Sequence, residues 1–596
     1  MAEGILFDLV GKMLEGLVSL AAEELGAAWG LKEEIDKLDR TASTIGAVLS
    51  DAEDQRNRNN HQPLSEDEEL EETGYEYFKD LVWRSFLECR SMDCLGESWF
   101  TIHDLMHDLA CSVAGKEYCI VGLEAENVNK RSRYVSFDSS REMGNTLLKA
   151  TKVRSFVGNK YWCVNRSLTC YFKCLRVLIF YGSDLKMLPH SIGNLKHLRA
   201  LYIVSNSNIR ELPSSLLMLQ LLETLNLDGC GELDCMPRGL GKLISLQNLP
   251  LFVVGRTTGK NVGGLSELNG LKKLRGKLHI LDLQNAIVEK GSTYLKDKLN
   301  LKSLVLEWRW RCREGETVLE CLQPHPNLEN LQVIGYPGSK MSSWLYSITN
   351  LTELILEGFA NCQHLQPLHQ LYSLKVIRLS RLEALENVSE TEMQEELVSG
   401  KSTTILFPSL EELEINDCPN LKGWWKGDVD EASNPHLPCF PCLSHLTIKH
   451  CPNLTTMPLF PSVTELKLEY TSSKPFQETM KLKKINIEAP SSSTLHPLSK
   501  LRILNIQRIQ DLHSLQEEFL QNLTSLQSLQ IKECLNLTSL PEGMCHLTSL
   551  TYLEIIDCPQ LSKRFQRETD LDCPNIAHIE RIWIIDRYIV QTRKGF

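Results

Sequence analysis

The sequence of 596 residues predicts an α/β solenoid of leucine-rich repeats, an irregular horseshoe, with a helical hairpin and a small helical unit before it. Two observations predict the solenoid. The pattern Leu-x-x-Leu-x-Leu, with Ile or Val tolerated, recurs mostly about every 20–29 residues, which is the leucine-rich-repeat period. Its apolar residues alternate, so that one face of a short strand is buried. A single copy cannot cover that face, and stacked copies form a parallel sheet over a continuous core.

The positions of the repeat copies predict where most strands of the solenoid lie. Clear ones begin at Leu198, Leu222, Leu301, Leu351, Leu410, Leu443, Leu501, Leu526 and Leu550. Two wider gaps, around residues 389–402 and 469–497, predict inserted loops. Several repeats also carry Leu-Pro, as in Leu212-Pro213, where proline suits a turn that needs no ladder donor.

Five of the 20 cysteines occupy one position of the repeat. The consensus places Asn or Cys three residues after the last apolar residue, and here that position holds Cys230, Cys418, Cys451, Cys534 and Cys558. A small, buried, weakly hydrogen-bonding side chain suits a stacked ladder at this turn. We therefore expect a structural ladder and no metal site, since Cys439 and Cys442 form the only Cys-x-x-Cys pair.

The N-terminal 60 residues predict two amphipathic helices that pack as an antiparallel hairpin. Apolar residues at helical spacing run from Ile5 to Leu17 and again from Leu31 to Leu49, and Gly26 and Gly30 lie between the two runs. The stripes indicate only that one face is buried, so packing within the chain and self-association through these helices are equally consistent.

A charged, polar segment over residues 61–72 predicts a linker. Residues 73–125 follow as a small unit, and residues 126–596 hold the repeats. His103 and His107 lie four residues apart on a predicted helix, but Asp104 stands where a zinc-binding H-E-x-x-H motif requires glutamate. We expect packing or hydrogen bonding from these histidines.

Composition excludes several classes of function. The net charge of −12 disfavours a nucleic-acid-binding surface. The N-terminus lacks a basic segment, and the sequence has no uncharged apolar run of about 18 residues, so we expect no signal peptide and no stable membrane span. We expect a cytoplasmic location, with the nucleus or the periphery of the plasma membrane as alternatives. An extracellular receptor is disfavoured for the same reason, although Asn350 and Asn522 lie in N-x-Thr sequons. No G-x-S-x-G elbow supports a hydrolase, and we expect no catalytic residue.

Three segments together make the chain resemble plant immune receptors of the coiled-coil, nucleotide-binding, leucine-rich-repeat family. The hairpin, with the run from Val48 to Gln55, resembles that family's Rx-type N-terminal domain. Residues 66–110 resemble its winged-helix subdomain, in which Met106, His107 and Asp108 match the MHD motif. The Cys-Pro-x-Leu turns resemble its repeats. The resemblance implies a winged-helix-like unit at 73–125, a role in defence, and ADP or ATP with magnesium as cofactors.

The chain departs from this family at the nucleotide-binding core. The motif G-x-x-x-x-G-K-[ST], whose amides cradle phosphates, is missing; Gly400-Lys401-Ser402 is a half-match with Glu395 where the first glycine belongs. Only a dozen or so polar residues separate the hairpin from the winged-helix-like unit. We therefore expect an internally truncated receptor with no bound nucleotide, in which the MHD residues are the remnant of a nucleotide-sensing motif. The alternative is an ADP/ATP-binding switch, as in full-length relatives.

Exposed positions beside the buried leucines are the natural protein contacts. The partner implied by the family is a pathogen effector, a guarded host protein or another receptor domain, and not nucleic acid. Plain solvation of a solenoid face is the competing interpretation for each position. Trp308 is the favoured single residue among the candidates, which are Glu223, Asn226, Glu307, Trp308, Glu329, Glu353, Glu411 and Glu414.

Overall fold

A computed structural model gives the fold. It describes residues 78–83, 87–92, 98–102, 117–121, 130–137, 151–158, 172–182, 185–256, 261–309, 315–365, 368, 371–389, 407–425, 439–481, 498–515, 520, 523–562, 576 and 578–585. The chain divides into two units, Met1–Cys119 and Ile120–Phe596. The predicted N-terminal hairpin, the linker and the MHD residues lie outside the described residues.

The described part of the first unit is a short helix over residues 78–83 and a β-hairpin. Strands β1 (Leu87–Met92) and β2 (Ser98–Ile102) pair antiparallel, with a register shift between Cys89 and Ser91. The ring of Phe78 packs edge-on against Phe100, with 4.9 Å between the ring centroids. Through this aromatic contact the helix packs against the hairpin.

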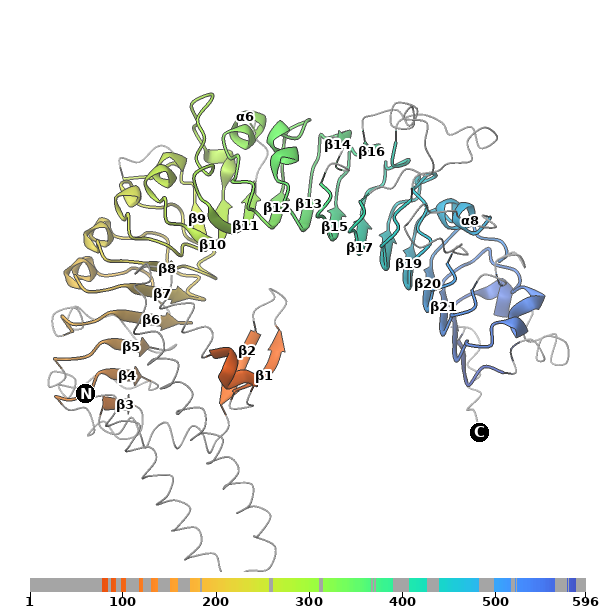
Figure 1. The fold of residues 1–596 in the computed structure, drawn as a ribbon, viewed down its shortest axis with the longest axis horizontal. Helices are drawn as coiled ribbons and strands as arrows, with labels where there is room; N and C mark the ends of the chain where they lie inside the picture. The colour runs from red at the N-terminus through yellow and green to blue at the C-terminus, as the bar shows by residue number, and fades with distance from the viewer. Residues whose placement is uncertain are drawn as a thin grey trace, which may run out of the picture. The chain divides into compact units, whose positions relative to one another are not determined.

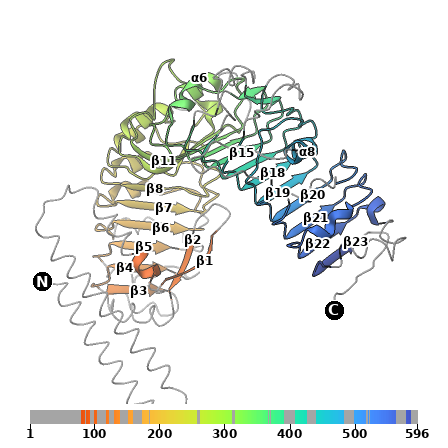
Figure 2. The ribbon, with the colours of Figure 1, turned by 45° about the vertical axis from the view of Figure 1, so that its right-hand side comes forward.

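The second unit is a parallel-stranded solenoid. Figures 1 and 2 show its strands side by side along the inner side of a curve, with the helical turns on the outer side. One sheet has six strands, β3 (Tyr118–Val121), β4 (Tyr134–Phe137), β5 (Ser155–Gly158), β6 (Val177–Tyr181), β7 (Ala200–Val204) and β8 (Thr224–Asn226). The longer sheet has thirteen described strands, β9 (Leu251–Val253), β10 (Arg275–Leu281), β11 (Asn300–Glu307), β12 (Asn330–Ile334), β13 (Glu353–Glu357), β15 (Val376–Ser380), β17 (Glu412–Asn416), β18 (His445–Lys449), β19 (Glu465–Glu469), β20 (Ile503–Gln507), β21 (Ser528–Lys532), β22 (Tyr552–Ile556) and β23 (Arg581–Ile585). Two short strands, β14 (His364–Leu365) and β16 (Asn387–Ser389), pair separately.

The predicted leucine-rich-repeat solenoid is confirmed. Each clear sequence copy contains a strand, and its leucines are buried; the copy that begins at Leu351 forms β13, in which Leu354 and Leu356 are fully buried. The outer elements are mostly short 3₁₀ helices: η4 (His190–Asn194), η5 (Ser214–Met218), η6 (Leu240–Lys242), η7 (Leu265–Gly270), η8 (Leu283–Asn285), η9 (Ser343–Ser347) and η11 (Glu542–His546), with α-helices α6 (Gly315–Glu320) and α8 (Lys474–Lys481).

The Leu-Pro motifs begin these 3₁₀ helices. Pro189, Pro213 and Pro541 precede η4, η5 and η11, with φ of −68°, −68° and −66°. Proline fixes φ near this value and has no N–H that a helix start would leave unbonded. The motif therefore sets where the chain turns on the outer side.

A single proline marks the break between the two sheets. The ladder from β8 continues to Asn248, whose carbonyl accepts a hydrogen bond from the N–H of Leu225 at 2.9 Å. The next bond across this pair would need an N–H from residue 250, which is proline and has none. The carbonyl of Pro250 instead accepts from His279 of β10 at 2.8 Å, and the second sheet begins here.

A left-handed residue follows the strand in many repeats. Arg381, Asp417 and His450 have φ of 53°, 52° and 51°. The N–H of Asp417 donates to the carbonyl of Lys449 at 3.1 Å, so the ladder extends one residue beyond the strand before the chain turns outward. At Gly335, with φ of 66°, a Cβ would lie 2.1 Å from the carbonyl oxygen of Trp308, so this position requires glycine.

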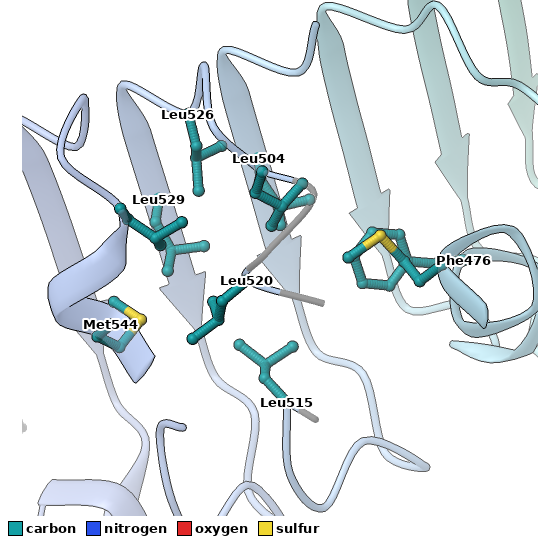
Figure 3. Close-up of a pocket in the computed structure, with 10 residues that line it drawn as sticks. Phe476, Leu504, Leu515, Leu520, Leu526, Leu529 and Met544 are labelled. Atoms are coloured by element: carbon teal, nitrogen blue, oxygen red, sulfur yellow. The ribbon is translucent and has the colours of Figure 1, made fainter. Parts of the chain in front are cut away.

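The predicted insertion over residues 469–497 contains a helix where we expected only a loop. α8 packs Phe476 and Met480 into the repeat core, and the Asp511 carboxylate accepts a hydrogen bond at 3.0 Å from the N–H of Ser473, which precedes the helix. An apolar cavity of about 10 Å³ lies where these two side chains meet leucines of β20, β21 and the neighbouring turns (Figure 3). That volume is about one water-sized probe, so the cavity is a small packing gap and not a ligand site. The other predicted insertion falls mainly outside the described residues.

Candidate protein-binding surface

The regular strands present three rows of side chains to the inner side of the solenoid. In β13, Leu354 and Leu356 are buried, whereas Glu353, Ile355 and Glu357 are half-buried. The parallel pairing repeats this arrangement strand after strand; Ile355 lies beside Gln332 of β12 and Arg378 of β15. We call the half-buried and exposed side chains of β4–β8, and of the strands from β10 to β23 that belong to the long sheet, the inner face; β14 and β16 are not part of it. Because the strands hold these positions in register, the inner face can bind one extended partner surface.

The first part of the inner face has no charged side chain on β4–β8. Its exposed aromatic residues are Tyr134 and Tyr181, which are 45% and 44% exposed. The half-buried or exposed positions around them are Ser136, Ser155, Val157, Val177, Ile179, Ala200, Tyr202, Val204, Thr224 and Asn226. Uncharged surface rich in tyrosine and aliphatic groups is typical of the centre of protein–protein interfaces.

The next part of the inner face is charged. The guanidinium of Arg378 on β15 lies 2.5 Å from Glu353 on β13 and 2.9 Å from Glu412 on β17. Glu414 approaches it at 3.8 Å. Three carboxylates around one guanidinium leave this region net negative, which favours a partner with complementary basic groups.

Four predicted contact residues do lie on the inner face: Asn226, Glu307, Glu353 and Glu414. Glu307 accepts a hydrogen bond from His279 Nε2 on the neighbouring strand, at 2.9 Å. That hydrogen bond, with the nearby Arg309 guanidinium, holds the pKa of Glu307 below its usual range. Glu307 therefore stays ionised at neutral pH and contributes to the negative region.

Three other predicted contacts form a separate row beside the inner face. Glu223, Glu329 and Glu411 each precede a strand and pair with a basic side chain of the preceding repeat. The distances are 2.9 Å to Arg199, 2.5 Å to Lys302 and 3.1 Å to Lys375. The three glutamate side chains are 31%, 47% and 57% exposed, so they remain accessible along the flank of the sheet.

The prediction for Trp308 was wrong. Trp308 is only 3% exposed, and its ring packs edge-on against Tyr336 at 5.4 Å, which in turn packs against Phe359 at 5.3 Å. The chain leaves β11 after Glu307 and turns Trp308 into the core, next to Gly335. Trp308 is a core residue of an aromatic stack and cannot contact a partner directly.

The ladder cysteines are buried and form hydrogen bonds within the repeat core. Cys230, Cys418, Cys451, Cys534 and Cys558 are all buried, and Cys230 Sγ donates to the carbonyl of Ile203 at 3.1 Å. Burial raises the pKa of Cys230 to about 11. The hydrogen bond with Cys418, together with burial, raises the pKa of Cys451. Sequence reasoning missed Asn206, which is the same ladder position three residues after Ile203 and donates to the carbonyl of Phe180 at 3.2 Å.

Other kinds of site find no support in the part of the chain that the structure describes. Within it, no three His, Cys, Asp or Glu side chains lie together as a metal would require. No described helix is long and apolar enough to cross a membrane. Cys439 of the Cys-x-x-Cys pair is buried and Cys442 is exposed, and burial raises the pKa of Cys439 to about 11.

Known protein families match about half of the chain. The Rx N-terminal domain family matches residues 9–70, and the disease resistance protein winged helix domain matches residues 63–110. The R13L1/DRL21 leucine-rich repeats match residues 265–382, and the RPS2-like leucine-rich repeats of plant disease resistance proteins match residues 328–471.

Several plant proteins are similar over most of the chain. A putative disease resistance protein RGA1 of Solanum bulbocastanum is 31% identical over 508 residues, covering 80% of this chain and 46% of the relative. The putative disease resistance protein RGA4 of the same plant is 31% identical, covering 86% of this chain and 55% of the relative. A leucine-rich-repeat protein of Leptospira interrogans has 19% identity and a TM-score of 0.39, covering 74% of this chain and 92% of that one.

The chain spans about half the length of these plant relatives. Its matches run in the same order as the segments recognised in the sequence: Rx-type domain, winged helix, repeats. The protein belongs to the Rx-type family of plant disease resistance proteins with leucine-rich repeats.

Proposed function

We propose that this protein acts in plant defence as a receptor-like binding protein in the cytoplasm, and not as an enzyme, by recognising another protein through its inner face. The observation that carries the proposal is the register of the repeats. It holds an uncharged, tyrosine-bearing region on β4–β8 of one sheet and a negative region around Arg378 on β13, β15 and β17 of the other. A pathogen effector, a guarded host protein or another receptor domain is the partner class.

The two regions suggest a division of roles in recognition. Tyr134 and Tyr181 supply rigid, amphipathic contact area, which gives binding energy when a partner covers it. The carboxylates around Arg378 steer and orient a partner that carries basic groups, because charge complementarity acts mainly on association rate and specificity.

We further propose that this polypeptide has no working nucleotide switch. The sequence lacks the phosphate-cradling G-x-x-x-x-G-K-[ST] motif, and the Rx-type and winged-helix matches overlap at residues 63–70. The overlap leaves no segment between them for a nucleotide-binding core. The residues present therefore do not fit ADP or ATP with magnesium, and His107 of the MHD motif has no phosphate site to sense.

A pair of tyrosine variants tests the recognition surface. Tyr181 lies on the inner face, whereas Tyr372 is 65% exposed and lies off the strands. We expect that Tyr181→Ser abolishes cross-linking of the full chain to proteins in leaf extracts. Tyr372→Ser should leave that cross-linking unchanged. Loss with both variants, or with Tyr372→Ser alone, would contradict recognition by the inner face.

A further inference from the structure

One flank of the first repeats is strongly basic. Residues 130–200 contain 14 Lys and Arg but only 3 Asp and Glu, in a chain whose net charge is −12. Before each of the strands β4–β7, three exposed or half-buried positions surround a buried residue that lies two residues ahead of the strand. Most of these positions hold a basic side chain, and we call the following nine residues the basic flank: Lys130, Arg131, Arg133, Lys152, Arg154, Lys173, Arg176, Lys196 and Arg199.

The backbone sets four arginines of the basic flank in one line. Each donates its N–H to the carbonyl of the arginine before it, at 2.7 Å for Arg154 and Arg176 and 2.8 Å for Arg199. The strands that follow pair in parallel register, so the Cα atoms of neighbouring arginines lie about 4.8 Å apart. Like charges at this spacing repel one another and disfavour the fold. A bound anionic partner would offset that repulsion.

The same row of positions is neutralised further along the solenoid. There Glu223, Glu329 and Glu411 each pair with a basic side chain of the preceding repeat. By contrast, the described residues between 130 and 210 include no Asp or Glu. Four members of the basic flank form no ion pair with any described residue: Lys152, Arg154, Lys173 and Arg176.

We propose that the basic flank binds an anionic membrane surface that exposes phosphatidylserine headgroups. Clusters of four to eight Lys and Arg are typical of such binding, and each basic side chain near the surface strengthens it about 5-fold. The three other positions of these turns hold Thr151, Cys174 and His197. The flank therefore carries no Phe, Tyr or Trp to stack on nucleic-acid bases and no Asn or Gln to read their edges, which favours a partner recognised by charge alone.

This contact adds a location to the proposed function and does not depend on it. The residues of the basic flank precede the strands, whereas the inner face consists of strand residues such as Tyr181. The two surfaces therefore use different side chains. A variant that loses membrane binding should keep the cross-linking that the inner face supports, and Tyr181→Ser should keep membrane binding.

Co-sedimentation of the full chain with lipid vesicles tests the proposal. The vesicles contain equal parts of phosphatidylcholine and phosphatidylserine, and vesicles of phosphatidylcholine alone are the reference. We expect binding to the anionic vesicles only, and binding should weaken as salt screens the charges. Lys152→Gln combined with Lys173→Gln removes two exposed charges and no buried group, so it should weaken binding about 30-fold.

An arginine at the same repeat position supplies the matched control. Arg502 precedes β20, is exposed, and lies between Thr464 and Gln527, to which its backbone is hydrogen-bonded. We expect Arg176→Gln to weaken vesicle binding about 5-fold and Arg502→Gln to weaken it less than about 2-fold. Equal effects of these two substitutions, or binding that the Lys152 and Lys173 substitutions leave unchanged, would overturn the proposal. So would a chain that stays unbound, or that binds duplex DNA more tightly than anionic vesicles at the same phosphate concentration.

Discussion

A buried lysine gives the sharpest test of how the repeat core is built. Lys298 lies three residues before Leu301, the position that Leu195, Leu219 and Ile348 occupy in other repeats. Its side chain is fully buried, and its ammonium group contacts the Asp297 carboxylate at 2.7 Å. Asp297 itself is 46% exposed.

Lys298→Met should therefore stabilise the repeats. Methionine keeps nearly the same length and apolar volume, so no cavity opens. The change removes a desolvated charge, and Asp297 can regain water because it is half-exposed. Replacing buried ion pairs with apolar residues has stabilised other proteins by about 1–4 kcal/mol, and we expect a gain at the lower end of that range.

The assay is urea denaturation of the full chain, with amide exchange of β11 to report this region because long repeat arrays do not unfold in one step. Lys302→Met is the matched control; Lys302 is 52% exposed and paired with Glu329, and its replacement should change stability by less than about 0.5 kcal/mol. A loss of more than about 1 kcal/mol in Lys298→Met would refute the reasoning, since it would show that the buried pair outweighs its desolvation.

Three further predictions concern the repeat geometry and the ladder. Gly335→Ala should destabilise by about 1–3 kcal/mol, measured by urea denaturation, because of the positive φ and the 2.1 Å approach to the Trp308 carbonyl; Ser205→Gly, at φ of 55°, should have a much smaller effect. Asp511→Ala should cost about 1–2 kcal/mol and speed amide exchange in α8, because the N–H of Ser473 loses its carboxylate acceptor; unchanged exchange in α8 would contradict that role. Cys230 should resist iodoacetamide below pH 9 in the folded chain while the exposed Cys442 reacts, because burial raises the pKa of Cys230 to about 11 from 9.0. The same shift favours the folded state below pH 9.0, and this contribution should be lost as pH rises from 9.0 through about 11.

The sequence pattern determines the repeats because their physics is local and periodic. Leucines at fixed offsets must be buried, so the strands follow at their predicted places. The ladder cysteines were predictable for the same reason, since the offset of Cys230 from Leu227, or of Cys418 from Ile415, sets burial. Asn206 could have been found by the same offset.

Features that depend on contacts between repeats were not predictable from the pattern. Trp308 turns inward because Gly335 of the next repeat has no side chain to collide with the Trp308 carbonyl. The Trp308 ring then packs edge-on against Tyr336. α8 is short and lies in an insertion of irregular composition, and its apolar residues are buried only because neighbouring repeats supply a core. The pattern also placed seven exposed glutamate and asparagine candidates on one surface, whereas the register separates them into an inner face and a flank.

Nucleotide binding by the purified full chain tests the central claim, recognition without a switch. The measurement is calorimetric titration with ADP and with ATP and magnesium, together with release of any co-purified nucleotide by denaturation. The account predicts no binding heat and no nucleotide in the denatured sample. Stoichiometric binding would contradict it, and would mean that the chain forms a phosphate site without the G-x-x-x-x-G-K-[ST] motif.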